Sequence, residues 1–170
     1  MTHLTNIGTF LGCIVMAMII CSGCYSFRGI TIPAEAETFF VSELTNRTPT
    51  APADIGQTFS ETLKQKLLNQ SRLNFSEIDP DLSFKGEVTR FSVTSVAPQP
   101  GEFTAFSRLD IGVKISYESR LDEEDNWDNS FSFYQDFERD QNLLDLQDQL
   151  IATIFQQLVE DIFNKAFTNW

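Results

Sequence analysis

Histidine and cysteine are scarce in this chain of 170 residues, which has one histidine and three cysteines. His3, Cys13 and Cys21 all precede Cys24. Processing before Cys24 would therefore leave a mature protein with one cysteine and no histidine. Disulfides, His/Cys metal clusters, Cys–His pairs and Ser–His–Asp triads would then be excluded. We predict no metal, no cofactor and no catalytic residues, and hence a protein that is not an enzyme.

Positive charge is also scarce, because 12 Lys and Arg residues stand against 24 Asp and Glu residues, for a net charge of −12. Nucleic-acid binding needs a basic surface, so no nucleic-acid partner is expected. The chain has 16 phenylalanines, which favours an aromatic-rich core over a disordered acidic tail. The length from Cys24 onward suits one domain with a real core.

The apolar run at residues 7–20 is uncharged but too short to span a membrane, which takes about 20 apolar residues. It matches the apolar region of a secretory signal. Small residues, Ser22 and Gly23, then precede Cys24, an arrangement that resembles the bacterial lipobox. In a lipobox the signal is cut before the cysteine, whose thiol carries a diacylglycerol and whose new amino group is acylated.

Cys24 is therefore predicted as the lipid-attachment site, with signal cleavage between Gly23 and Cys24. Two or three acyl chains anchor a protein firmly, at about 0.8 kcal/mol per buried CH₂. The signal is atypical, because Cys21 replaces the usual Leu and residues 1–6 contain no Lys or Arg. The alternative is a short hydrophobic anchor or buried helix. The expected organisation is a signal peptide at residues 1–23, a lipidated tether at 24–37 and a single domain at 38–170.

Two segments have helical periodicity. Residues 54–70 place apolar side chains every four positions on one face, and Asp54 and Gln57 have the spacing of a capping box. Residues 142–167 carry a wider apolar stripe and predict one long helix.

Four segments are predicted as strands: residues 38–44, 81–96, 107–121 and 130–139. The third alternates most cleanly, with its apolar residues on one face. A phase switch near Thr89–Arg90 predicts a β-bulge. The order predicts an α+β fold, with two helices packed on one face of a four-stranded, mostly antiparallel sheet and charged residues on the open face.

Three segments carry a family resemblance: "CYSFRGITIP", "NRTPTAPADIGQTFSETLKQKLLNQSRL" and "LVEDIFNKAFTNW". Together they resemble the LptE-like lipopolysaccharide-assembly lipoproteins of the Bacteroidota, over nearly the whole mature chain. The resemblance implies a lipoprotein anchored in the outer membrane on its periplasmic side. The implied partner is the LptD β-barrel, which the lipoprotein plugs and helps to assemble, and lipopolysaccharide is an implied ligand. The family has no catalytic motif, and its fold is two helices on a four-stranded sheet.

Five basic residues on the middle strands could meet lipopolysaccharide phosphates, because arginine binds such groups bidentately. They are Lys85, Arg90, Arg108, Lys114 and Arg120. We favour a solvated face of mixed sign, since carboxylates are interleaved with them. The connection with Pro98, Pro100 and Phe103 is a candidate partner contact, because prolines stiffen a loop and an aromatic side chain can anchor an interface. An ordinary hairpin loop is the alternative.

The leading prediction is a non-enzymatic subunit of the lipopolysaccharide translocon. The second is a free-standing periplasmic lipoprotein that binds or carries a lipid or peptide, which would need an apolar pocket. A lipid-anchored hydrolase of the cell wall is remote, since no catalytic motif is present.

Overall fold

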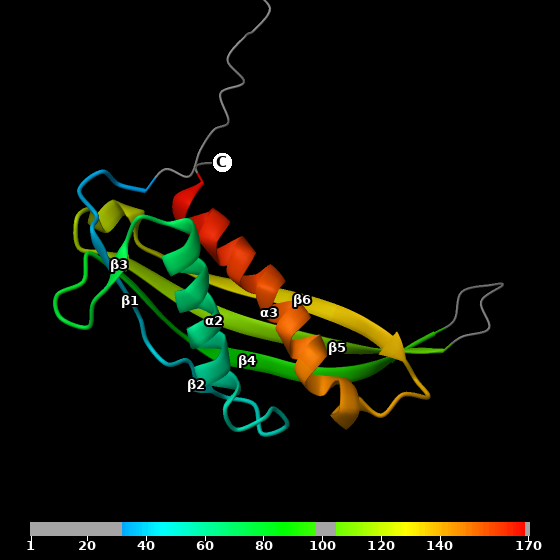
Figure 1. The fold of residues 1–170 in the computed structure, drawn as a ribbon. Helices are drawn as coiled ribbons and strands as arrows, with labels where there is room; N and C mark the ends of the chain where they lie inside the picture. Colours follow the sequence, from blue (N-terminus) through cyan, green and yellow to red (C-terminus); the bar gives the residue numbers. More distant parts are fainter. Residues whose placement is uncertain (1–31, 98–104, 169–170) are drawn as a thin grey trace, which may run out of the picture.

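The structure is a computed structural model, and it describes residues 32–97 and 105–168. It has two layers, a β-sheet and a pair of helices that cover one face of the sheet (Figure 1). The strands are β1 (Thr38–Val41), β2 (Thr45–Asn46), β3 (Asn74–Phe75), β4 (Leu82–Val96), β5 (Phe106–Ser119) and β6 (Trp127–Glu138). The helices are α2 (Ile55–Gln70), α3 (Leu143–Phe167) and a single 3₁₀ turn at Glu123–Asp125.

The sheet is mixed, with strand order β3-β1-β4-β5-β6 and with β2 also paired to β4. The α+β class with two helices is confirmed, but the expected number of four strands is wrong. The structure adds β2 and β3, which at two residues each are too short to show a sequence period. β1 runs parallel to both β3 and β4, because the crossover through α2 returns the chain in the same direction. The three long strands, β4 to β6, form the expected antiparallel meander.

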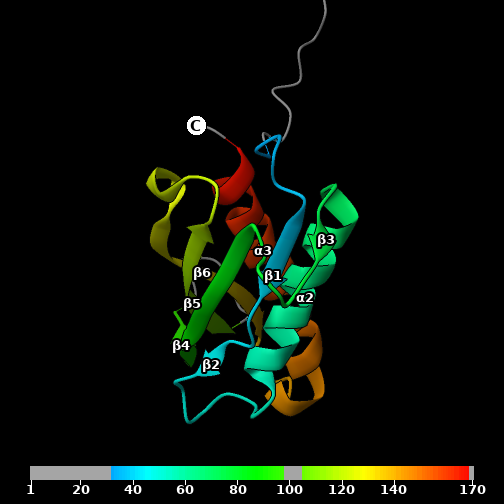
Figure 2. The same ribbon diagram turned by 90° about the vertical axis from the view of Figure 1, so that its left-hand side faces the viewer.

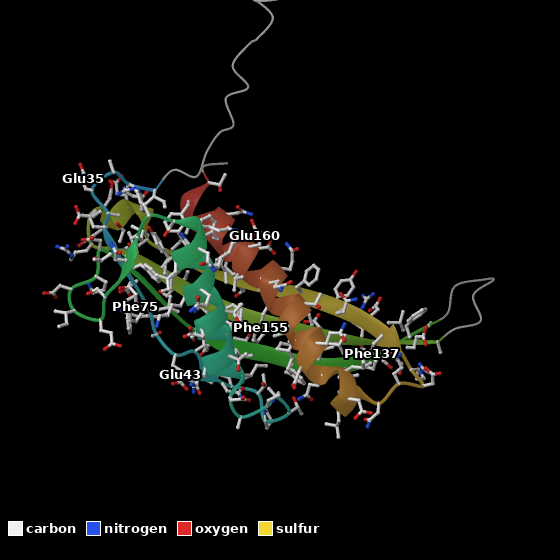
Figure 3. The ribbon with its side chains drawn as sticks, viewed as in Figure 1. Glu35, Glu43, Phe75, Phe137, Phe155 and Glu160 are labelled. Atoms are coloured by element: carbon white, nitrogen blue, oxygen red, sulfur yellow. The ribbon has the colours of Figure 1, made fainter. Side chains whose placement is uncertain are left out.

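The two helices bury the predicted apolar stripes against the sheet. α2 lies over the β1 side and α3 crosses the long strands obliquely, as the two views show (Figures 1 and 2). The rings of Phe59 and Phe155 meet edge to face, with their centroids 4.9 Å apart, and so join α2 to α3. Phe155 lies near the middle of the molecule, and Phe137 closes the core toward the far end of the long strands (Figure 3).

The predicted bulge is present, since the β4–β5 register shifts between Val88 and Arg90. The extra residue turns Phe91 toward the helices, where it is buried. Val93, two positions on, is nevertheless 45% exposed, because the helix layer no longer covers the strand fully there. The alternation of β5 is confirmed along its length, with Leu109 and Ile111 fully buried.

The helix starts differ from each other. Asn142 caps α3, accepting a hydrogen bond from the backbone N–H of Leu144 at 3.2 Å. Asp54 stands at the N-cap position of α2, but its side chain makes no capping hydrogen bond, so the predicted capping box is wrong. The first turn of α2 instead packs closely on the preceding chain at Gly56, where a Cβ would overlap the carbonyl oxygen of Leu44. The space there admits only a glycine.

The described part of the predicted tether, residues 32–37, packs on the domain. Ala36 is fully buried. The guanidinium of Arg72 donates to the carbonyl oxygens of Pro33, at 2.6 Å, and Ala34, at 3.0 Å. In the part of the chain that the structure covers, neither helix is long and apolar enough to cross a bilayer.

Candidate interaction surfaces

The positions predicted from the signal and the loop fall outside the described residues. These are Gly23 and Cys24 in the N-terminal segment, and Pro98, Pro100 and Phe103 between β4 and β5. Lipid attachment at Cys24 and partner contact through the loop therefore stay predictions.

Four of the five predicted basic residues lie together on the open face of the sheet. β5 alternates, so its odd-numbered residues face the helices and its even-numbered residues, such as Arg108 and Lys114, face away from them. Lys85 and Arg90 share that outer face from β4, where Arg90 lies over Gly112. Arg120 is placed elsewhere, just beyond the end of β5.

Carboxylates on the same surface neutralise most of these cations. Lys85 pairs with Glu118 at 2.6 Å and Arg90 with Asp110 at 3.1 Å. Register explains these pairs, because each carboxylate lies on the neighbouring strand, two positions from the residue directly opposite the cation. Among the residues that the structure describes, Lys114 is the one member of the set without an ion pair. The open face therefore carries ion pairs of basic and acidic side chains and is not a basic patch.

Arg108 makes the most elaborate of these contacts. Its Nε and Nη2 donate to the two carboxylate oxygens of Asp136, at 2.7 and 2.9 Å. Its guanidinium also lies over the ring of Tyr134, 3.6 Å from the centroid. The hydrogen bonds from Arg108 lower the pKa of Asp136, and the same pair raises the pKa of Arg108. This fork is already occupied, so a lipid phosphate would have to displace Asp136.

Arg120 belongs to a structural cluster around Asp81. One carboxylate oxygen of Asp81 accepts hydrogen bonds from the backbone N–H groups of Glu37 and Thr38, both at 3.0 Å, and from the Thr38 hydroxyl at 2.9 Å. The other oxygen accepts from Arg120. These bonds, the one from Glu37 first, lower the pKa of Asp81 to about 2 despite its burial. The cluster ties the starts of β1 and β4 to the end of β5.

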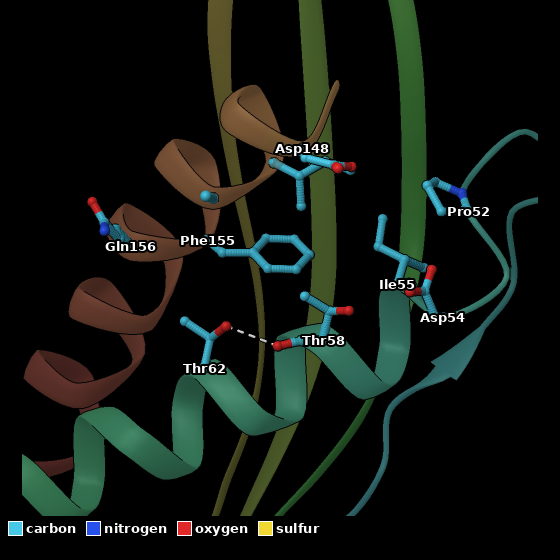
Figure 4. Close-up of a pocket in the computed structure, with 10 residues that line it drawn as sticks. Pro52, Asp54, Ile55, Thr58, Thr62, Asp148, Phe155 and Gln156 are labelled. Atoms are coloured by element: carbon cyan, nitrogen blue, oxygen red, sulfur yellow. Dashed lines mark hydrogen bonds between the residues drawn. The ribbon is translucent and has the colours of Figure 1, made fainter. Parts of the chain in front are cut away.

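A groove of about 390 Å³ lies between the N-terminal halves of α2 and α3. Thr58, Thr62 and Gln156 line it, and the ring of Phe155 points into its base (Figure 4). Phe155 is only 1% exposed, so the core closes the groove below. Its walls mix these polar side chains with apolar ones, among them Ile55, Ile151 and Ala152. Within the described ranges, no three His, Cys, Asp or Glu side chains are grouped to hold a metal ion.

The fold and its surfaces define a class of small α+β domain, with two helices on one face of a mixed sheet and an ion-paired opposite face. The chain belongs to the LptE family of lipopolysaccharide-assembly proteins, whose family model matches residues 36–166. That family is one of lipoproteins of the Gram-negative outer membrane and is non-catalytic. The family that the sequence resembles is thus confirmed. The comparison with curated proteins gives no match.

Three solved structures are similar to this chain at low identity, and the first two share its fold. One is the hypothetical protein CT253 from Chlamydia trachomatis, with a TM-score of 0.54 and 9% identity over 79% of this chain and 99% of that one. A minor lipoprotein from Acinetobacter baumannii gives 0.50 and 11%, over 76% and 91% of the two chains. The rare lipoprotein B from Shewanella oneidensis gives 0.45 and 12%, over 74% and 89%.

Proposed function

We propose that this protein is the lipoprotein subunit of an LptD-type β-barrel and acts in lipopolysaccharide assembly without catalysis. It occupies the barrel as a plug and assists the assembly of the barrel. The acyl chains on Cys24 hold it at the periplasmic side of the outer membrane. The match of the family model across residues 36–166 supports the assembly role.

The open face of the sheet is the observation that carries the plug proposal. Its charges are largely paired with one another before any partner arrives. Enclosing paired charges is less costly than burying unpaired ones, because each ion keeps its hydrogen-bonding partner. Such a face can be surrounded by the polar lumen of a barrel. The connection between β4 and β5, by this proposal, adds Phe103 as an aromatic anchor for the partner.

Direct contact with lipopolysaccharide is the weaker part of the proposal. Phosphates at Lys85, Arg90, Arg108 or Arg120 would compete with the carboxylates that now bind them. Lys114 makes no ion pair among the described residues, since Glu87, which lies opposite it on β4, pairs with Arg47. Lys114 is therefore the first position at which we place a lipid phosphate. The groove between the helices gives little support to a lipid-carrier function, because the buried ring of Phe155 closes its base.

Affinity purification of the full-length protein from outer membranes tests the plug proposal. The expected result is a stoichiometric complex with a large β-barrel. The same preparation, analysed by mass spectrometry, should give Cys24 as an acylated N-terminus. Lipid without a barrel in the eluate would favour the carrier function instead. If the eluate contains the barrel but the protein still carries residues 1–23, the proposed partner stands and the proposed lipid anchor is refuted.

The loop is tested separately with Phe103→Asp, and Phe103→Leu is the matched control. A charge in a desolvated contact is costly unless it is paired, so the Asp variant should recover less barrel while the Leu variant behaves like wild type. Equal recovery by both variants would remove the loop from the interface.

A further inference from the structure

The outer edge of β6 exposes a regular row of backbone hydrogen-bonding groups. The N–H of Arg139 donates to the carbonyl of Ala105 at 3.0 Å, and these two residues continue the β5–β6 register. In an antiparallel pair, mutually bonded residues alternate with unbonded ones. The odd-numbered residues of β6 therefore bond to β5. The N–H and C=O groups that point outward belong to Asp128, Ser130, Ser132, Tyr134, Asp136 and Glu138.

This edge lacks the usual protections against strand pairing. Natural edges are blunted by short length, lysine, proline or a bulge. β6 is 12 residues long, contains neither lysine nor proline, and pairs with β5 without a register shift. Its middle, residues 129–135, is uncharged. Of the described residues, only those of β5 pair with it. The opposite side of the sheet is interrupted, because β3 and β2 are two residues each and β4 beyond Val88 pairs only with β5 among the described residues.

The charges of β6 indicate which kind of strand fits. Its charged residues are all acidic: Asp128, Asp136 and Glu138. A second copy of β6, paired antiparallel about its centre, would place Asp128 opposite Asp136 or Glu138, and like charges directly opposite one another are destabilising. Arg108 already neutralises Asp136. Asp128 and Glu138 are exposed and lie about 33 Å apart along the strand at 3.3 Å per residue.

The side chains between Asp128 and Glu138 determine which side chains would fit on a strand paired with this edge. Phe131 and Phe133 lie on the helix side, half-buried against the core. A neighbouring strand would cover them with β-branched or other apolar residues. Ser130 and Ser132, on the open side, are small and polar, so hydroxyl-bearing partners such as Thr fit beside them.

We propose that the β6 edge binds an extended segment of a partner protein as an additional strand of the sheet. The segment alternates apolar and polar residues and carries Lys or Arg near both ends, facing Asp128 and Glu138. Backbone hydrogen bonds to the outward groups supply affinity, and the alternating side chains and terminal charges supply selectivity. The proposal specifies the chemistry of the bound segment and holds whether or not the partner is a barrel.

The test uses full-length protein in detergent and a synthetic peptide of about eleven residues, the length that spans Asp128 to Glu138 at about 3.3 Å per residue. The peptide has Lys at each end and alternating Val and Thr between; a control peptide has Glu at each end. Hydrogen exchange should show protection of the outward N–H groups of Ser130, Ser132 and Tyr134 in the presence of the Lys-ended peptide. That peptide should bind about three- to tenfold more tightly than the control.

Ser132→Pro removes one outward N–H without touching the bonds to β5, and Ser132→Ala retains it. The Pro variant should lose peptide binding while the Ala variant keeps it. If Ser132→Pro does not fold, Asp128→Lys with Glu138→Lys serves instead, and it should reverse the preference to the Glu-ended peptide. Equal binding of both peptides, or no protection of β6, overturns the proposal. So does protection of these N–H groups without peptide in a concentration-dependent dimer, because the occupant would then be a second copy.

Discussion

The two faces of the β4–β5–β6 meander come from the same strands and differ in almost every physical respect. On the helix side Leu109, Ile111 and Val113 are fully buried. On the open side Arg108, Asp110 and Lys114 alternate with them and face away from both helices. The covered face supplies most of the free energy of folding, because apolar burial dominates that term. The open face contributes little stability, and it leaves a surface whose composition is free to serve a partner.

Loss of a core aromatic side chain should have the largest effect. Phe155→Ala removes the ring that contacts Phe59 and leaves a cavity between α2, α3 and the sheet, so the free energy of unfolding should fall by about 3–5 kcal/mol. Chemical denaturation measures it. Leu144→Ala is the control in the same helix, since Leu144 is 76% exposed and should change stability by less than about 0.5 kcal/mol. Equal losses for both would mean that the stripe of α3 is not the core.

Substitution of one glycine on each face compares the two faces more closely. At Gly86 on β4, a Cβ would overlap the carbonyl oxygen of Lys114 and press on the Ile115 side chain. Gly86→Ala should therefore cost about 2–3 kcal/mol through strain in the backbone and core. At Gly112, on the open face, the nearest atom is the Arg90 Cβ at 3.2 Å, so a shift of a few tenths of an ångström accommodates an added Cβ. Gly112→Ala should cost less than Gly86→Ala by denaturation; the reverse order would contradict the assignment of faces.

The hydrogen-bonded carboxylate of Asp81 should make the stability of the fold depend on pH. Its pKa is about 2 in the folded protein, below the ordinary value of 3.8, because the charged form accepts hydrogen bonds from Glu37, Thr38 and Arg120. A depressed pKa stabilises the fold above the unfolded value, so this contribution is complete above about pH 4 and is lost as the pH falls toward 2. Asp81→Asn should lower stability by about 1–2 kcal/mol at neutral pH.

The difference between wild type and Asp81→Asn should shrink between pH 4 and pH 2 in denaturation experiments. Asp122→Asn, at an exposed carboxylate of the acidic turn, is the control and should show a smaller change. A wild-type advantage that persists unchanged at pH 2 would show that the low pKa is not the source of the effect.

The sequence predicts the elements that have a period and misses those that depend on tertiary contacts. β5 and α3 are long, and their apolar alternation or stripe identifies both the element and its buried face. The bulge in β4 is visible because Phe91 breaks the parity set by Leu82 and Phe84. β2 and β3 are two residues each: β2 forms where the chain leaving β1 runs beside β4, and β3 forms where α2 returns the chain beside β1.

The surfaces are likewise predictable from the sequence only where they follow from a period. Alternation predicts that the basic residues of β4 and β5 share the open face. Their pairing with carboxylates depends on strand register, which alternation alone does not give, so the role of Arg120 beside Asp81 could not be foreseen. The free edge of β6 likewise requires both the strand order and the hydrogen-bond parity. The acidic composition of that strand is the one signal in the sequence that could have drawn attention to it.

The smallest effect should distinguish two ion pairs on the open face. Arg108 and Asp136 are about two-thirds buried, doubly hydrogen bonded and stacked on Tyr134, whereas the side chains of Lys85 and Glu118 are about half exposed. A double-mutant cycle with Arg108→Met and Asp136→Asn should give a coupling energy of about 1 kcal/mol, since bidentate geometry reduces the entropy lost in pairing. The cycle with Lys85→Met and Glu118→Gln should give less than about 0.5 kcal/mol, and 1 M salt should abolish it, because screening acts most strongly on exposed charges. Equal couplings that respond equally to salt would mean that the whole open face is solvated uniformly and that Arg108 has no special rigidity to offer a partner.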